Sequence, residues 1–176
     1  MIHFDIRHYP EISSTNAIAR DEAGRGAPEG LVITADYQTE GRGKPGRKWE
    51  SPSGKNLLFS VLLRPALEAA KIPILTQIAC RSVAAVLEHD YGLRPVFKRP
   101  NDVLIDGKKI CGILTEASSA GARVDYVVIG IGLNVNAGGE TIFPGATSLK
   151  METGRETDRA ILLRQILEQL GKDLRS

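Results

Sequence analysis

Residues 31–64 read LVITADYQTEGRGKPGRKWESPSGKNLLFSVLLR, which is two apolar runs separated by a long polar segment. The first run, residues 31–37, is typical of a strand. The second, residues 56–64, is almost continuously apolar, which predicts a central strand covered on both faces of its sheet. Because a structureless connection of this length inside a compact domain is usually functional, the polar segment is the first candidate for a binding site.

The polar segment begins with a basic loop, residues 37–49, which contains three glycines, one proline and four cations. Glycine lets a ligand approach the main chain closely. The cations Arg42, Lys44, Arg47 and Lys48 repel one another unless an anion lies among them. The composition therefore predicts a loop that orders around a ligand bearing a phosphate or a carboxylate, although a solvated basic turn explains it equally well.

The overall composition is that of one folded domain, with 176 residues, of which 42% are hydrophobic and 25% charged. A net charge of only +2 means that any phosphate or nucleic-acid role must come from local clustering. Cys80 and Cys111 each lie in an apolar pattern, which indicates small buried side chains in a reducing compartment. We see no secretory signal and no apolar run that approaches membrane-spanning length, so we expect a cytoplasmic protein without a membrane partner.

Hydrophobic periodicity predicts the other elements. Residues 13–16, Ser-Ser-Thr-Asn, are four N-cap types before a short helix that ends near Gly24. A cap needs one such residue, so the surplus hydroxyls and amide could face a polar, uncharged ligand group. The strongest helix covers residues 72–91, where apolar residues recur at steps of three and four. The remaining predictions are strands at residues 2–6, 95–98, 103–105, 108–116 and 124–136, turns at 106–107 and 118–121, a loop at 142–149, and a helix at 158–174 capped by Thr157.

Strands cluster along the chain instead of alternating with helices. This order predicts an α+β fold, with a mixed, mainly antiparallel sheet and helices packed on one side of it, in preference to a doubly wound fold. Gly112 lies within a predicted strand, where a glycine suggests close approach of a ligand or of another backbone. Gly130 and Gly132 alternate along another strand, so they share one face and leave a slot beside the sheet.

Two lysines extend the set of cations beyond the basic loop. Lys98 stands at a predicted strand end, and Lys109 follows the turn at residues 106–107. Each is more often an ordinary surface lysine, but with the loop cations they could surround a triphosphate, usually with Mg²⁺. Asn101 and Asp102 could hold that ion or orient a nucleotide. The chain contains no Walker A pattern, dinucleotide fingerprint, Ser-His-Asp set or metal-binding spacing of cysteine and histidine.

Six ordered motifs resemble those of the catalytic domain of the biotin protein ligase family. They are Ser-Thr-Asn at 14–16, Gln38 with GRGKPGRKW at 41–49, KRPND at 98–102, KICGILTE at 109–116, GIGLN at 130–134 and ATSL at 146–149. The resemblance covers nearly the whole chain, and six motifs in order are specific where one alone would be weak. It implies the fold that biotin ligases share with class II aminoacyl-tRNA synthetases.

The resemblance implies a ligase that uses biotin, ATP and Mg²⁺. Biotin's carboxylate would attack the α-phosphorus of ATP, giving biotinyl-5′-AMP and pyrophosphate. A lysine amine on a biotin carboxyl carrier protein, such as that of acetyl-CoA carboxylase, would then attack this mixed anhydride. Because both partners in the first step are anionic and the intermediate hydrolyses in water, cations must screen the site and a loop must close over it.

The same resemblance assigns roles to individual residues. Lys109, Arg42 and Lys44 are implied as the catalytic cations. The residues implied to contact biotin are Ser14, Thr15, Asn16 and Gln38 at the ureido end, Arg42, Gly43, Lys44 and Lys109 near the carboxylate, and Gly112, Ile113, Gly130 and Gly132 as walls of the slot. The residues implied to contact ATP are Arg47, Trp49, Lys98, Asn101 and Asn134, with Trp49 near the adenine.

Two positions depart from the family pattern, since Lys44 replaces the usual arginine and Arg99 the usual tryptophan. Lysine keeps the charge but loses the fork that grips an oxyanion bidentately, so we expect a looser hold on the adenylate. We expect residues 1–176 to form a single catalytic domain, without the N-terminal helix-turn-helix domain of the bifunctional members and without the usual small C-terminal β-barrel domain. Repressor activity is therefore not expected.

Other interpretations stay open. A lipoate or octanoate protein ligase or transferase shares the fold, although the glycine-rich loop and the Ser-Thr-Asn motif favour biotin. A nucleic-acid-binding module could use the basic loop, but an aromatic content of 5% and a near-neutral charge argue against nucleic acid as a partner. The chain could also be a ligand-binding domain without catalysis. An uncovered strand at the sheet edge could pair with a second copy, so a homodimer is a further alternative.

Overall fold

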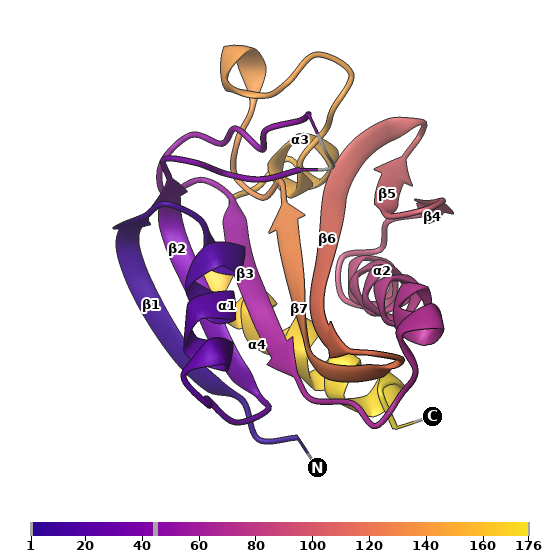
Figure 1. Ribbon diagram of the computed structural model, residues 1–176. Helices are drawn as coiled ribbons and strands as arrows, with labels where there is room; N and C mark the ends of the chain where they lie inside the picture. The colour runs from indigo at the N-terminus through magenta and orange to yellow at the C-terminus, as the bar shows by residue number, and fades with distance from the viewer. Residues whose placement is uncertain (1, 44–45, 176) are drawn as a thin grey trace.

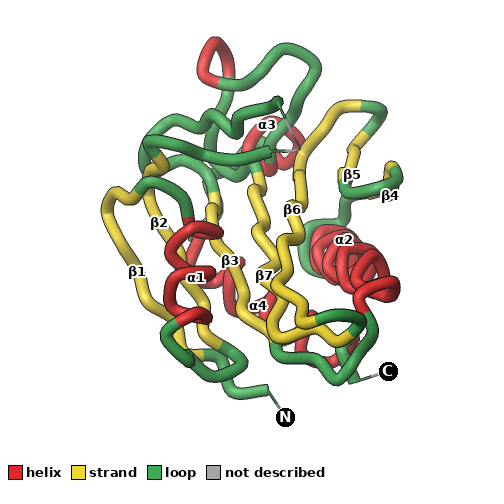
Figure 2. Tube along the Cα trace, viewed as in Figure 1, coloured by secondary structure: helices red, strands yellow, loops and turns green. Residues whose placement is uncertain are grey.

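The computed structural model describes residues 2–43 and 46–175. A seven-stranded sheet forms its centre, in the order β1-β2-β3-β7-β6-β5-β4 (Figures 1 and 2). The strands are β1 (Asp5–Ile12), β2 (Leu31–Gln38), β3 (Leu57–Leu63), β4 (Pro95–Lys98), β5 (Asp102–Ile105), β6 (Lys108–Ala120) and β7 (Arg123–Leu133). The helices are α1 (Thr15–Gly24), α2 (Ile72–His89), α3 (Leu149–Thr153) and α4 (Arg159–Asp173), with short 3-10 turns at Ala69–Lys71 and Gly139–Thr141.

The sheet is mixed, because β1 and β2 are parallel while every other neighbouring pair is antiparallel. The predicted α+β class with a mainly antiparallel sheet is therefore confirmed. β3 lies between β2 and β7 and is buried along its whole length, as its continuous apolar sequence predicts. Asp106 and Gly107 have φ angles of 46° and 77°, which confirms the two-residue hairpin turn expected there.

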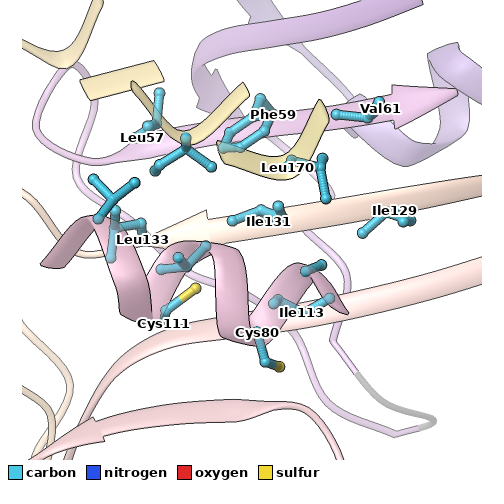
Figure 3. Close-up of a cluster of buried hydrophobic side chains, with 14 of the residues drawn as sticks. Leu57, Phe59, Val61, Cys80, Cys111, Ile113, Ile129, Ile131, Leu133 and Leu170 are labelled. Atoms are coloured by element: carbon cyan, nitrogen blue, oxygen red, sulfur yellow. The ribbon is translucent and has the colours of Figure 1, made fainter. Parts of the chain in front are cut away.

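Helices cover both faces of the sheet, which corrects the prediction that they pack on one side. α2 and α4 lie against the larger core cluster, which includes Phe59 and Ile131 (Figure 3). α1 lies over the opposite face, where Ala19 packs in a second cluster with Leu31 (Figure 1). Successive residues of a strand face opposite sides, so apolar neighbours such as Leu31 and Val32 require a cover on each face.

One helical stretch among the described residues, Ala69–His89, is long and apolar enough to cross a membrane by length and composition alone. This corrects the expectation that no apolar run approaches that length. Its residues Leu75, Val83 and Leu87 are buried in the core cluster against the sheet and α4. The apolar face that this helix packs against the core accounts for its composition.

Several boundaries differ from the prediction. β1 starts later than expected, at Asp5, and β6 continues to Ala120, so the turn that follows it is shorter. α3 was not expected. α4 is capped by Asp158 and not by Thr157, because the Asp158 carboxylate accepts hydrogen bonds from two main-chain N–H groups at 2.8 and 3.1 Å.

The strand register brings the glycines of two strands together. Gly132 pairs with Leu58 on β3 and with Gly112 on β6, and Gly130 pairs with Ser60 on β3. Directly paired residues share a face of the sheet, so these side chains all lie on the face that α1 covers. The basic loop and the segment after β7 lie at the same end of the sheet, opposite the two chain termini (Figure 1).

Candidate active site

Three glycines form the floor of a cavity of about 100 Å³ on the α1 face of the sheet. A Cβ atom on Gly130 would lie 2.1 Å from Asn16 Oδ1. A Cβ atom on Gly132 or Gly112 would lie 2.6 or 3.0 Å from the Trp49 indole. Protein side chains do not approach so closely, so the floor has room for its neighbours only because these positions are glycine. The predicted slot is present, and the Trp49 indole lies in it.

Polar side chains at the start of α1 line one end of the cavity. Ser14, Thr15 and Asn16 are each at most 4% exposed. Gln38 Oε1 accepts hydrogen bonds from Thr15 N at 2.7 Å and from Thr15 Oγ1 at 3.1 Å. These bonds fix the orientation of the Gln38 amide and leave its Nε2 as a donor. The Ser14 side chain does not cap the helix, so its hydroxyl is a second donor at this end.

The Asn16 amide is held in one orientation by three neighbours. Its Nδ2 donates to Leu114 O at 3.3 Å and to Glu116 Oε2 at 2.9 Å. Its Oδ1 accepts from Ser60 Oγ at 2.6 Å and faces Gly130. This end of the cavity therefore combines an oriented acceptor with the two donors described above. Such a set suits an uncharged group that carries both N–H and C=O.

Two cations also border the cavity. Lys109 Nζ lies 2.8 Å from Asp102 Oδ1 and 5.5 Å from the centre of the Trp49 ring. Arg42 Nη1 lies 3.2 Å from Glu116 Oε1. Each cation is paired with a carboxylate in the absence of a ligand, and each borders the cavity. An anion that entered here would meet two cations from different parts of the chain.

The basic loop folds into a narrow hairpin beside the slot. Gly43 N donates to Arg47 O, and Trp49 N donates to Gly41 O, each at 3.0 Å. A Cβ atom on Gly41 would lie 2.1 Å from Trp49 O, so this crossing requires glycine. Gly43 and Arg47 border the cavity, as expected for a loop that orders around an anionic ligand. Lys44, the remaining predicted cation, lies outside the described residues.

Three buried polar atoms at the cavity lack a hydrogen-bond partner among the described residues, namely Trp49 Nε1, Asn101 Oδ1 and Asp102 Oδ1. Asn101 is oriented by its Nδ2, which donates to Ile113 O at 2.6 Å. Asp102 Oδ1 lies close enough to Lys109 to form an ion pair, but the angles of this contact are not those of a hydrogen bond. Buried polar groups normally have partners, so three such atoms around one cavity indicate that it takes up a polar ligand.

The two thiols do not contribute to this chemistry. Burial raises the pKa of the Cys80 thiol to about 12, with the nearby Asp102 carboxylate adding to the shift. Burial also raises the pKa of the Cys111 thiol well above its usual value. Both side chains are free of disulfides and stay protonated, which confirms that they are small buried core residues and excludes a thiolate nucleophile at either position.

The cavity brings together most of the residues proposed from the sequence. Those that border it are Ser14, Thr15, Asn16, Gln38, Arg42, Gly43, Arg47, Trp49, Asn101, Lys109, Gly112, Ile113, Gly130 and Gly132. They come from α1, β2, the basic loop, β6, β7 and the turn before β5. Segments far apart in the sequence thus meet at one end of the sheet.

Three of the proposed residues do not present side chains to the cavity. The Ile113 side chain belongs to the core cluster on the other face of the sheet (Figure 3). Asn134 is 7% exposed and ties the end of β7 to its neighbours, since it donates to Thr147 O at 3.0 Å and accepts from Asn56 Nδ2 at 3.2 Å. Lys98 is exposed on β4 and does not border the cavity.

Two polar residues of the site were not proposed from the sequence. Ser60 interrupts the apolar strand β3 and donates to Asn16. Glu116 ends the KICGILTE motif and accepts from Asn16 and Arg42. The signal for Glu116 was strand alternation, because Glu116 stands four positions after Gly112 in β6 and therefore shares its face.

Comparison with known proteins places this fold and site in a family. A family model described as the Biotin/lipoate A/B protein ligase family matches residues 9–134. The chain is 43% identical over 161 residues to the bifunctional ligase/repressor BirA of Bacillus spizizenii, covering 89% of this chain and 49% of that protein. The chain belongs to the Biotin/lipoate A/B protein ligase family.

Other relatives agree with this assignment. A biotin–[acetyl-CoA-carboxylase] ligase of Mycobacterium tuberculosis is 34% identical over 171 residues, covering 91% of this chain and 60% of that protein. A biotin protein ligase from Aquifex aeolicus, solved with biotin and ATP, superposes with a TM-score of 0.82 at 33% identity, covering 97% of this chain and 70% of that one. The chain spans about half the length of the two BirA proteins from Bacillus that it resembles.

Proposed function

We propose that this chain catalyses the ATP-dependent biotinylation of a lysine on a biotin carboxyl carrier protein, through biotinyl-5′-AMP. The observation that carries the proposal is the cavity with two unlike ends. Asn16 Oδ1 and the Gln38 amide stand at one end, and Lys109 stands at the other, beside Gly112. Arg42 borders the same cavity and shares the Glu116 carboxylate with Asn16. Biotin has the matching form, since its cyclic urea carries one C=O and two N–H groups and its valeryl chain ends in a carboxylate.

The names of the relatives support the same proposal. The Aquifex aeolicus ligase was solved with biotin and ATP, and a biotin protein ligase from Leishmania major with biotinyl-5-AMP. The second of these structures is 29% identical to this chain, covers 94% of it and superposes with a TM-score of 0.74. The urea-binding end also separates biotin from lipoate and octanoate, because neither of those acids carries a group that uses an oriented amide acceptor with two donors.

In the first step, a carboxylate oxygen of biotin attacks the α-phosphorus of ATP, and pyrophosphate leaves. Both reactants are anions, so their approach requires positive charge at the point of contact. Lys109 stands at the end of the cavity away from Asn16, where a carboxylate anchored by its urea end would reach it, and Arg42 borders the same cavity. Their roles are to neutralise the two reacting groups and to stabilise the additional charge on the phosphate in the transition state.

In the second step, the amine of the carrier lysine attacks the carbonyl carbon of the mixed anhydride, and AMP leaves with the bonding electrons. The amine loses a proton as the amide bond forms. The basic loop protects the anhydride from water until the carrier arrives. Its hairpin contacts, from Gly43 N to Arg47 O and from Trp49 N to Gly41 O, place it at the mouth of the cavity.

The site carries oxygen atoms of the kind that bind a magnesium ion. Asn101 Oδ1 and Asp102 Oδ1 are buried oxygen atoms without hydrogen-bond partners among the described residues, and Mg²⁺ prefers one or two such ligands together with phosphate oxygens. These two residues would hold the ion, which would neutralise the phosphates of ATP. Among the described residues there is no cluster of three or more His, Cys, Asp or Glu side chains that could bind a metal without the nucleotide.

The partners follow from the reaction and from the names of relatives. A biotin–[acetyl-CoA-carboxylase] ligase of Paracoccus denitrificans is 38% identical to this chain, which supports a carboxylase carrier protein as the acceptor. We place the reaction in the cytoplasm, where free thiols such as Cys80 and Cys111 persist. β1 pairs only with β2 and leaves one edge of the sheet uncovered, so a homodimer formed along this edge is the assembly we propose to test by light scattering.

The function is tested by calorimetry and by pyrophosphate release. We expect biotin to bind in the micromolar range or more tightly, and ATP with Mg²⁺ to release pyrophosphate without carrier protein. Lys109→Ala should slow this release about 100-fold or more, which is the usual effect of removing one group that stabilises transition-state charge. Lys108→Ala is the matched control, because Lys108 is exposed and does not border the cavity. Binding of octanoate in place of biotin would overturn the proposal.

A further inference from the structure

Glu116 holds Asn16 and Arg42 side by side through its two carboxylate oxygens. Oε2 accepts from Asn16 Nδ2 at 2.9 Å, at the uncharged end. Oε1 accepts from Arg42 Nη1 at 3.2 Å, in the basic loop. The same Oε1 accepts from Arg20 Nη1 on α1 at 2.9 Å. The Glu116 side chain is 23% exposed, so it is largely shielded from solvent by these partners.

We propose that Glu116 is a positioning residue that holds Arg42 in the ligand-free protein and releases it to the carboxylate of the ligand. The proposal rests on the proposed function in taking biotin as that ligand. In the free protein Arg42 forms an ion pair with the Glu116 carboxylate, and in the complex it would form one with the carboxylate of the ligand. Binding then exchanges one carboxylate partner of Arg42 for another.

The geometry favours this exchange because the departure of Arg42 leaves no charge unpaired. Glu116 keeps Arg20 on the same oxygen, at a shorter distance than Arg42, and keeps Asn16 on the other. The Arg42 side chain is 49% exposed, so solvent screens its ion pair and lowers the cost of breaking it. Lys109 differs, since its partner Asp102, at 2.8 Å, is a different carboxylate that also borders the cavity.

The oxygen that holds Asn16 is not the oxygen that holds Arg42. Release of Arg42 therefore leaves the Asn16 amide in the orientation that places its Oδ1 against Gly130. Glutamine at position 116 would keep an oxygen that can accept from Asn16 Nδ2, but it would remove the charge that attracts the two arginines. This difference separates the effect of Glu116 on Arg42 from its effect on Asn16.

The test compares biotin with biotinamide, in which the carboxylate is replaced by a neutral amide. Glu116→Gln should strengthen biotin binding relative to biotinamide by about two- to five-fold, the range expected when a partly exposed ion pair no longer competes. Biotinamide affinity should stay unchanged. Glu22→Gln is the matched control, because Glu22 also accepts from two arginines, Arg7 and Arg25, and its side chain is 24% exposed. Glu22→Gln should leave the ratio of biotin to biotinamide affinity as it is in the wild type.

The same comparison in an Arg42→Gln background shows whether the effect of Glu116 on biotin binding depends on Arg42. If Glu116 acts through Arg42, Glu116→Gln should no longer change the ratio of biotin to biotinamide affinity there. An equal gain in this ratio in both backgrounds would mean that only the local charge matters. No gain in the ratio with Arg42 present would mean that Glu116 does not restrain Arg42. Either result overturns the proposal. Circular dichroism melting of each variant confirms that it is folded.

A measurement without ligand separates this proposal from the proposed function. The Gly43 amide donates to Arg47 O in the hairpin that Arg42 begins. If Glu116 holds Arg42, hydrogen exchange at the Gly43 amide should become several-fold faster in Glu116→Gln, whether or not biotin binds. Unchanged exchange overturns the proposal. Failure of the wild-type protein to bind biotin, together with faster exchange in the variant, would overturn the proposed function and leave the role of Glu116 intact.

Discussion

Replacing Gly130 by alanine should remove tight biotin binding while leaving the protein folded. The added methyl group would lie 2.1 Å from Asn16 Oδ1, far inside the 3.0 Å limit that real Cβ atoms respect. The Asn16 amide must therefore leave its position. It then loses the hydrogen bond from Ser60 and those it donates to Leu114 O and Glu116.

The cost to stability is limited because two of these neighbours have other partners. Ser60 Oγ keeps a second hydrogen-bond partner at 2.8 Å, and Glu116 keeps the bond from Arg20 at 2.9 Å. Leu114 O and the displaced Asn16 amide lose their hydrogen-bond partners. A buried polar group left unpaired costs about 1–3 kcal/mol, so we expect the free energy of unfolding to fall by about that amount.

The cost to biotin affinity is larger. Binding loses the oriented acceptor of Asn16, which is worth about 0.5–1.5 kcal/mol as a neutral hydrogen bond. The methyl group also fills part of the slot, and overpacking of this kind costs about 1–3 kcal/mol. Together these terms amount to about 1.5–4.5 kcal/mol, or a loss of affinity of about 10- to 2,000-fold.

Isothermal titration with biotin and urea denaturation measure the two effects. Gly138→Ala is the control, because a Cβ atom there would lie 3.8 Å from the Met151 side chain, which is ordinary contact. A second test repeats Gly130→Ala in an Asn16→Ala background, where the clash is absent and the loss of stability should disappear. If Gly130→Ala binds biotin as the wild type does, or costs the same stability in both backgrounds, the reasoning from close approach is refuted.

Three further predictions concern single side chains. Trp49 is the sole tryptophan of the chain and lies in the slot, so its emission should change when biotin is added, and a titration without any change would contradict its placement there. Asp158→Ala should lower the free energy of unfolding in urea by about 1 kcal/mol, because it removes the cap of α4; an unchanged midpoint would show that the cap contributes nothing. Burial is the largest single influence and raises the pKa of Asp36, but the hydrogen bond from Arg159 at 2.8 Å, the charge of Arg159 and the contact with His8 together outweigh it and leave that pKa below the usual 3.8. The stability from this pair is therefore present above 3.8 and lost as the pH falls through the lower folded value, so Asp36→Asn should flatten the acid-side loss in thermal melts.

Much of the fold and site could be predicted because the relevant signals are local. The unbroken apolar run in β3 identified a central strand, and the alternate glycines at 130 and 132 identified a slot. The surplus of cap-type residues at 14–16 indicated a polar ligand group, and these side chains indeed face the cavity without a cap bond from Ser14. Each of these inferences needed only the spacing of residues along one element.

Other features depend on partners from distant parts of the chain. Asn134 follows a glycine-rich strand and has the chemistry of a ligand contact, but Thr147 O and Asn56 occupy its amide. Ile113 borders the cavity as predicted, but its side chain packs in the core on the face opposite to that of Gly112, as strand alternation requires. The one-sided helix packing failed for a similar reason, because which face a short helix covers is decided by tertiary contact.

β7 has one further consequence for how this protein can change over evolution. Its residues alternate between Gly130 and Gly132, which make room for a ligand, and Ile129, Ile131 and Leu133, which fill the core. Insertion or deletion of a single residue within the strand would turn the isoleucines into the ligand cavity and leave glycine-sized voids in the core. Ligand preference in this strand can therefore drift only by point substitution at the glycine positions, while the intervening positions vary with the packing of α2 and α4. The two sets of positions can diverge independently, but the length of the strand is fixed for both.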